Sequence, residues 1–72
     1  MNEKDDIILA YLEDVGVAEP PAVIHFNIKK QEDVEFVEKT TKRRLKRLLN
    51  VGLVERAYVK GRYYEFNEEG RA

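Results

Sequence analysis

The sequence predicts an α+β fold in which three helices are followed by a two-stranded β-hairpin. Two segments have apolar residues at the three- and four-residue spacing of an amphipathic helix, and a glycine that can end the helix follows each of them, Gly16 and Gly52. Between these segments, the pair Pro20-Pro21 marks the start of a short helix. Downstream of Gly52, β-branched and aromatic residues surround Lys60-Gly61, a pattern typical of a hairpin.

The first helix is expected from Glu3 to Val15. Its apolar face repeats at i, i+3, i+4 and i+7, and acidic residues occupy the first turn, where they suit the helix dipole. The residues of the apolar face are Ile8, Tyr11, Leu12 and Val15. After Gly16, Val17 and Ala18 form an extended link that is long enough to add a minor strand to the hairpin.

The second helix is expected from Pro21 to Ile28. Pro21 suits the first helical position, because the N–H that proline lacks would have no partner there. Some combination of Val23, Ile24 and Ile28 is expected to be buried. The chain from Lys29 to Val37 leaves two alternatives open. Either Asp33 caps a helix that starts at Val34 and runs to Asn50, or Val34 and Phe36 belong to an extended linker and the helix starts near Glu38, which we favour.

The third helix, Glu38 to Asn50, carries six Lys or Arg residues against one Glu. Like charges at i,i+3 and i,i+4 destabilise an isolated helix, so we expect a partner outside the chain to offset the repulsion. A helical wheel places a core-facing stripe around Thr41 and four cationic or polar side chains on the opposite face. The stripe contains Val37, Thr41, Arg44, Leu45 and Leu48, and the opposite face contains Lys39, Arg43, Lys46 and Asn50. Arg44 lies at the border of the stripe, where an ion pair with an acidic residue of the first helix is one of the alternatives.

The hairpin is expected to pair Leu53–Val59 with Arg62–Asn67. A loop with an even number of residues would place Arg56 opposite Glu65 and turn Leu53, Ala57, Tyr64 and Phe66 inward, whereas an odd loop would invert this assignment. Residues 68–72 are expected to be mobile.

Length and composition restrict the class of protein. The chain has 72 residues, which make one domain, and it has no cysteine, so neither a disulfide nor a thiolate metal site can form. No apolar run is long enough to span a bilayer, and we expect a cytoplasmic protein with no membrane contact. The net charge is −1, but residues 1–36 carry −6 and residues 37–72 carry +5. The surface is therefore expected to divide into an acidic and a basic face.

Catalytic chemistry finds little support in these residues. The chain contains no serine and no cysteine, which excludes a Ser or Cys nucleophile, and its only histidine, His25, is expected to be an ordinary residue of the second helix. The carboxylates are not accompanied by a glycine-rich phosphate loop. We expect no catalytic residue, no metal, no cofactor and no enzymatic activity.

The order of helix, helix, basic helix and hairpin in about 65 residues is that of a winged helix-turn-helix domain. The segments that carry a closer resemblance are residues 41–49 (Thr-Lys-Arg-Arg-Leu-Lys-Arg-Leu-Leu), 52–55 (Gly-Leu-Val-Glu), 64–66 (Tyr-Glu-Phe), 69–72 (Glu-Gly-Arg-Ala) and the second helix from Pro20 to Ile28. Together they resemble the small archaeal winged-helix proteins related to the phi-H halophage repressor. The connection from Ile28 to Glu38 is longer than the usual three or four residues of a helix-turn-helix.

This resemblance implies that the helix from Lys39 to Asn50 enters the major groove of DNA and that the hairpin tip lies along the neighbouring backbone or minor groove. The residues expected to contact DNA are Lys39, Thr40, Lys42, Arg43, Lys46, Lys60 and Arg62. Among them, Arg43 is expected to read a base, because a guanidinium can hold guanine O6 and N7 together. The lysines are expected to meet phosphates.

The expected function is that of a sequence-specific, double-stranded DNA-binding transcriptional regulator of the repressor type, acting as a monomer or a homodimer. The alternative is a winged-helix module for protein–protein interaction that uses the acidic N-terminal half, since fold alone does not determine function. RNA binding is a third option with less support, because the hairpin lacks the stacking aromatics of RNA modules.

Overall fold

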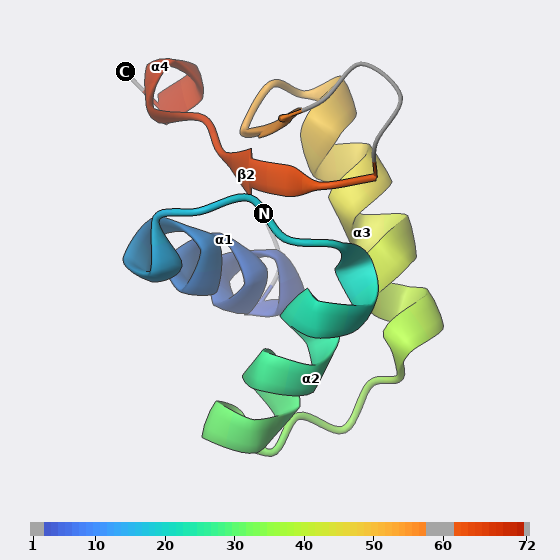
Figure 1. The fold of residues 1–72 in the computed structure, drawn as a ribbon. Helices are drawn as coiled ribbons and strands as arrows, with labels where there is room; N and C mark the ends of the chain where they lie inside the picture. The colour runs from blue at the N-terminus through green and yellow to red at the C-terminus, as the bar shows by residue number, and fades with distance from the viewer. Residues whose placement is uncertain (1–2, 58–61, 72) are drawn as a thin grey trace.

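The computed structural model describes residues 3–57 and 62–71. The chain order is α1 (Glu3–Val15), α2 (Pro21–Glu32), α3 (Glu38–Asn50), β1 (Val54–Arg56), β2 (Tyr64–Phe66) and α4 (Glu68–Arg71). Three helices are thus followed by a two-stranded antiparallel sheet, which confirms the predicted α+β winged helix-turn-helix layout. Figure 1 shows the sheet lying over one end of the three-helix unit, with α3 beside it and α4 at its far end. Within the described residues, no helix has the length and apolar character needed to cross a membrane.

One hydrophobic core joins α1, α2, α3 and the sheet. Its most deeply buried members come from all three long helices, and β1 and β2 close it from the side of the hairpin. The core consists of Ile8, Leu9, Tyr11, Leu12, Ile24, Ile28, Val34, Leu45, Leu48, Val54 and Tyr64. Because each helix contributes only one stripe to this core, its other face is left for solvent or a partner.

Helix α2 starts where the sequence predicts and ends one turn later. Pro21 is the first helical residue, after Pro20 in an extended conformation. The predicted end at Ile28 is wrong, because Lys, Gln and Glu favour helix and carry α2 on to Glu32 without an apolar period. Asp33 then stops the helix in the left-handed conformation, with its N–H donating to the Lys29 carbonyl at 2.9 Å. Ile24 and Ile28 are buried as predicted.

The favoured alternative for the connection between α2 and α3 is confirmed, since α3 begins at Glu38 and Asp33 does not cap it. The linker is closed onto the body of the protein by Val34, which is buried, and by Phe36, whose ring lies 5.9 Å from that of His25. Val37 is 62% exposed, so its assignment to the core-facing stripe is wrong. It precedes the helix in an extended conformation and therefore does not follow the helical wheel.

The inner face of α3 holds two polar contacts beside its apolar residues. Thr41 is fully buried, and its hydroxyl lies 2.8 Å from His25 Nδ1 on α2. Arg44 reaches α1, where its Nε and Nη2 donate to the two carboxylate oxygens of Asp5 at 2.7 and 2.6 Å. The open question about Arg44 is thus answered by a two-bond ion pair with an acid of the first helix. These hydrogen bonds to Asp5 raise the pKa of the Arg44 guanidinium.

A turn that requires one residue in the left-handed backbone conformation ends α3. Gly52 has φ 81°, its N–H donates to the Leu49 carbonyl at 3.1 Å, and the N–H of Leu53 donates to the Leu48 carbonyl at 3.0 Å. These two bonds form a Schellman motif, so the helix ends at the glycine that the sequence predicts. Asn67 ties the turn to the end of β2, since its Nδ2 donates to the Gly52 carbonyl and its N–H to the Leu53 carbonyl.

The hairpin register differs from the even-loop register by one residue. Arg56 pairs with Tyr64 and Glu55 with Glu65, and the Ala57 N–H donates to the Tyr63 carbonyl. Directly opposed residues share one face of the ladder, so Arg56 lies on the same face as Tyr64 and Glu55 lies on the other. The residues of β2 that were expected to face inward do so. In β1 the buried residue is Val54, which was not among those expected to face inward.

A hydrogen-bond network joins the link before α2 to the helices and the sheet. Glu19 forms an isolated antiparallel bridge with Tyr64, so the predicted minor strand occurs one residue after Val17 and Ala18. The hydroxyl of Tyr11 donates to Glu19 Oε1 and accepts from Asn27 Nδ2 at 2.7 Å. The C-terminal residues, which were expected to be mobile, include the single helical turn of α4, while Ala72 lies outside the described residues.

The ion pair between α1 and α3 leads to a prediction about stability. Asp5→Asn leaves the Arg44 charge without its counter-ion at a site where Asp5 is 3% exposed, so we expect a clear fall in the urea midpoint of unfolding. Asp6→Asn removes the same charge from the neighbouring, exposed position and is expected to change the free energy of unfolding by about 0.5 kcal/mol or less. Equal midpoints for the two variants would show that the pair does not hold α3.

The Tyr11 network leads to a prediction about alkaline pH. Burial, and then the hydrogen bond to Glu19, raise the pKa of the Tyr11 hydroxyl. The unfolded chain therefore loses this proton first, and the stability that Tyr11 contributes is complete below about pH 10 and is lost as the pH rises above that value. Urea unfolding from about pH 8 to about pH 11 should show the difference between the wild type and Tyr11→Phe shrinking at the alkaline end. A constant difference would contradict this assignment, and Tyr63→Phe serves as an exposed control.

Candidate nucleic-acid interface

The exposed face of α3 forms a continuous cationic strip. Lys39, Lys42, Arg43 and Lys46 are all exposed and line a shallow groove together with Glu38. The opposite side of the same helix is the buried face that contains Thr41, and the helix period of 3.6 residues accounts for this division. The structure therefore brings together four of the seven residues that the sequence predicts to contact DNA.

Two of the predicted contacts on α3, Lys42 and Thr40, differ from the others in their surroundings. Lys42 pairs with Glu38 at 3.6 Å, but both side chains are about half exposed, and an exposed pair of this kind contributes about 0–1 kcal/mol. Its ammonium group is therefore free to exchange partners at little cost. Thr40 lies in the first turn, half-buried, and is not among the residues that line the groove.

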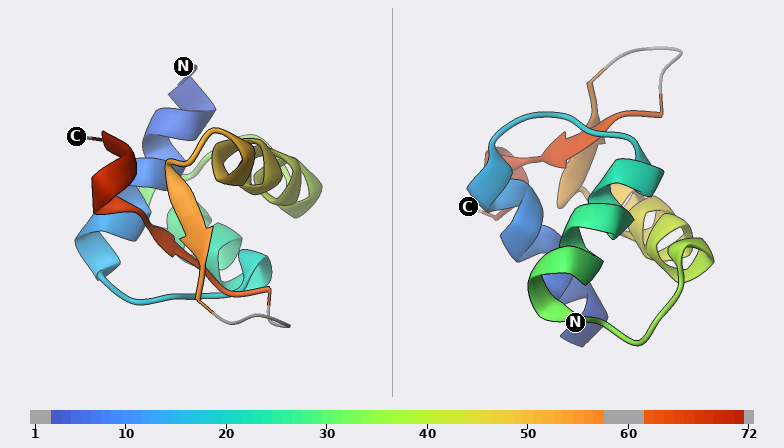
Figure 2. Two further views of the ribbon diagram at one scale, coloured as in Figure 1. Left: turned by 90° about the horizontal axis from the view of Figure 1, so that it is seen from above. Right: turned by 60° about the horizontal axis from the view of Figure 1, so that its bottom comes forward.

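A second depression connects the strip to the hairpin. It lies where the start of α2, the outer side of α3 and the two strands meet, an arrangement that can be followed in Figure 2. Lys42 and Lys46 belong to both the strip and this depression, and Arg62 joins them from the hairpin. Its lining residues are Pro20, Pro21, Ala22, Lys42, Lys46, Leu49, Arg56, Arg62 and Tyr64. Lys60, the remaining predicted contact, lies outside the described residues.

Arg56 is a member of this depression that the sequence analysis did not select. The even-loop register placed it opposite Glu65, where the two charges would have been neighbours. In the structure it pairs with Tyr64 and so belongs to the depression, with Glu55 and Glu65 on the other face of the ladder. The alternative with an odd loop was the signal in the sequence that could have identified Arg56.

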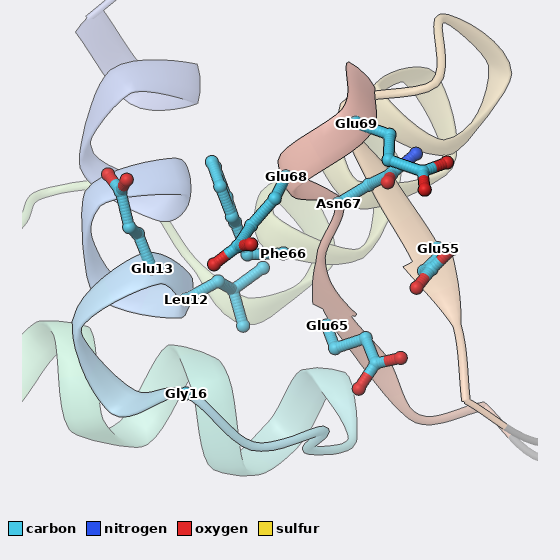
Figure 3. Close-up of a pocket in the computed structure, with 9 residues that line it drawn as sticks. All are labelled: Leu12, Glu13, Gly16, Glu55, Glu65, Phe66, Asn67, Glu68 and Glu69. Atoms are coloured by element: carbon cyan, nitrogen blue, oxygen red, sulfur yellow. The ribbon is translucent and has the colours of Figure 1, made fainter. Parts of the chain in front are cut away.

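An acidic depression occupies a different part of the surface. Figure 3 shows side chains from the end of α1, the two strands and α4 arranged around Leu12 and Phe66. The five carboxylates are those of Glu13, Glu55, Glu65, Glu68 and Glu69. Four of these five belong to the second half of the sequence, although that half is basic overall. The acids that line this depression therefore come mainly from the half of the chain that is basic overall.

His25 is buried and makes its contacts inside the protein. Its Nδ1 contacts the Thr41 hydroxyl and its ring packs against Phe36, so its described contacts are with α3 and the linker. Across residues 3–57 and 62–71, no group of three or more His, Asp or Glu side chains is placed to hold a metal ion.

Comparison with known proteins yields no relative. The chain matches no family model, no curated protein and no solved structure. The fold and the distribution of side chains over it are therefore the observations that bear on function.

Proposed function

We propose that this protein is a cytoplasmic, sequence-specific double-stranded DNA-binding regulator of transcription that acts as a repressor and has no enzymatic activity. The observation that carries the proposal is the continuity of the cationic surface. Lys42 and Lys46 belong both to the strip on α3 and to the depression that contains Arg56 and Arg62. One polyanion could contact the helix and the hairpin at the same time. The resemblance to the small archaeal winged-helix proteins related to the phi-H halophage repressor supports the same assignment.

The dimensions of DNA suit this arrangement. The major groove is about 12 Å wide and admits an α-helix, so α3 can enter it with the strip facing the base edges. In that position Arg43 reads guanine through O6 and N7, while Lys39 and Lys46 meet the flanking phosphates. Arg62 then lies beside the neighbouring backbone. A domain of this size covers few base pairs, and two copies on a palindromic site would double the contacts.

The inner contacts of α3 support a fixed geometry of recognition. Asp5 holds Arg44 from α1, and His25 holds Thr41 from α2, so two polar contacts fix the rotation of α3 about its own axis. Side chains that read bases need this kind of support, because a small misplacement loses directional hydrogen bonds.

The alternative function, docking to another protein, gains its support from the acidic depression. Glu13 lies there with Glu68 and Glu69, so a basic partner surface would be complementary to it. A pull-down in which a basic protein partner is lost on Glu13→Gln, with no DNA retained by the wild type, would favour this alternative.

DNA binding by this surface is expected to depend strongly on salt. If about five cations neutralise about five phosphates, the association constant should fall by about 500-fold between about 50 and about 200 mM salt. Fluorescence titration of a labelled duplex selected from a random pool measures this slope. The absence of binding at the lower salt concentration would defeat the proposal.

Two substitutions on α3 should separate base reading from phosphate contact. Arg43→Ala is expected to remove about 1–3 kcal/mol of discrimination between the preferred duplex and one with a changed guanine. Lys46→Ala should weaken binding to all duplexes alike and reduce the salt slope by about 0.9. Arg47→Ala is the matched control, because Arg47 is exposed on the same helix but lines neither the strip nor the depression. Equal effects of all three changes would contradict the assigned roles.

A further inference from the structure

The depression between α2, α3 and the hairpin differs in chemistry from the strip on α3. Of the described residues, all five that line the groove on α3 are charged, whereas five of the nine that line the depression are not: Pro20, Pro21, Ala22, Leu49 and Tyr64. The four charged residues among those described are all cations, and all four are exposed, whereas four of the five uncharged residues are buried or half-buried. The site therefore has a cationic rim and an apolar floor.

We propose that this depression binds a small organic anion with an aromatic or branched apolar body, and that the bound anion competes with DNA. The second part of the proposal builds on the proposed function, whereas the binding of the anion does not depend on it.

The floor is the first argument for an amphipathic ligand. A DNA phosphate is polar on all sides and gains no favourable contact from the apolar floor. This floor includes Leu49, which is half-buried, Tyr64 and the two prolines. An apolar ring placed there would remove both its own surface and that of the floor from water, which is the main favourable term in binding small molecules.

The size and the charge of the site are the second argument. The depression encloses about 490 Å³, within the range of about 300–1,000 Å³ that is usual for small-molecule sites. Arg56 and Arg62 offer planar guanidinium groups that can hold a carboxylate, sulfonate or phosphate by two bonds. Among the described residues that line the depression, none is acidic, so an anion meets no repulsion from them.

The site shares residues with the surface that is proposed to bind DNA. Lys42 and Lys46 line both the depression and the strip. An anion in the depression would neutralise the lysines that are proposed to contact DNA phosphates, and it would occupy the space beside the hairpin. Each ligand must therefore weaken the binding of the other by the same factor.

Naphthalene-2-sulfonate is a suitable probe, titrated into ¹⁵N-labelled full-length protein and followed by NMR. We expect saturable shifts concentrated at the amides of Ala22, Leu49 and Tyr64. Inorganic sulfate, which lacks the ring, and 2-naphthalenemethanol, which lacks the charge, should each bind at least about tenfold more weakly. Shifts spread evenly over the chain, or sulfate that binds as well as the sulfonate, would overturn the proposal.

Variants locate the site. Arg56→Gln and Arg62→Gln, both at exposed positions, should each weaken naphthalene-2-sulfonate about tenfold, and Arg47→Gln should leave it unchanged. Unchanged affinity in both of the first two variants would overturn the site, and a dispersed spectrum of each variant checks that it is folded.

A competition experiment separates the two parts of the proposal. Release of a bound duplex by naphthalene-2-sulfonate, but not by the same concentration of sodium sulfate, supports competition. A duplex that stays bound at saturating probe overturns competition and leaves DNA binding intact. A protein that binds the probe but no duplex at low salt retains the anion site, and the proposed function itself fails.

Discussion

The ion pair between Asp5 and Arg44 is the constraint on which the candidate interface depends. Successive residues of a helix are separated by about 100°, so directing one side chain of α3 at α1 fixes the direction of all the others. Arg44 is held to both carboxylate oxygens of Asp5, and the contact between Thr41 and His25 fixes the preceding turn from α2. With these two side chains turned inward, the remaining cations point outward. Buried ion pairs contribute modestly to net stability, and here we assign the pair a role in defining orientation.

The long connection between α2 and α3 is accommodated by the same region of the molecule. Its residue Phe36 packs against His25 and lies under the ammonium of Lys4, 5.9 Å from the ring centroid. The linker is therefore in contact with α1 and α2 through Phe36, and Val34 is buried in the core. The additional residues of this helix-turn-helix lengthen α2 by a turn and fill space beside α1, so α3 still packs against the first two helices.

The sequence was sufficient for the features that depend on local chemistry. Pro21 at the start of α2 and Gly52 after α3 act through their own backbone preferences, and both were predicted correctly. The extension of α2 past Ile28 was missed because Lys29 to Glu32 have helix propensity without an apolar period.

Features that depend on pairing between distant residues were beyond single-sequence reasoning. The partner of Arg44 lies 39 positions away, among several acids of α1, so the sequence could offer the ion pair only as an alternative. The register of the hairpin follows from the number of residues in its loop, and a change of one residue moved Arg56 to the other face of the sheet. The candidate DNA contacts on α3 follow from the helical period, whereas the depression that joins them to the hairpin required the three-dimensional structure.

The backbone bridge between Glu19 and Tyr64 has a consequence for how this protein behaves at high concentration. Tyr64 is paired with Arg56 on one side and with Glu19 on the other, so β2 is covered along both edges at its first residue. The outer edge of the sheet is left to β1, which has only three residues, two of them charged and exposed. Short charged edges are poor templates for adding strands from another molecule. This small sheet should therefore resist the edge-to-edge strand pairing between molecules that leads to aggregation.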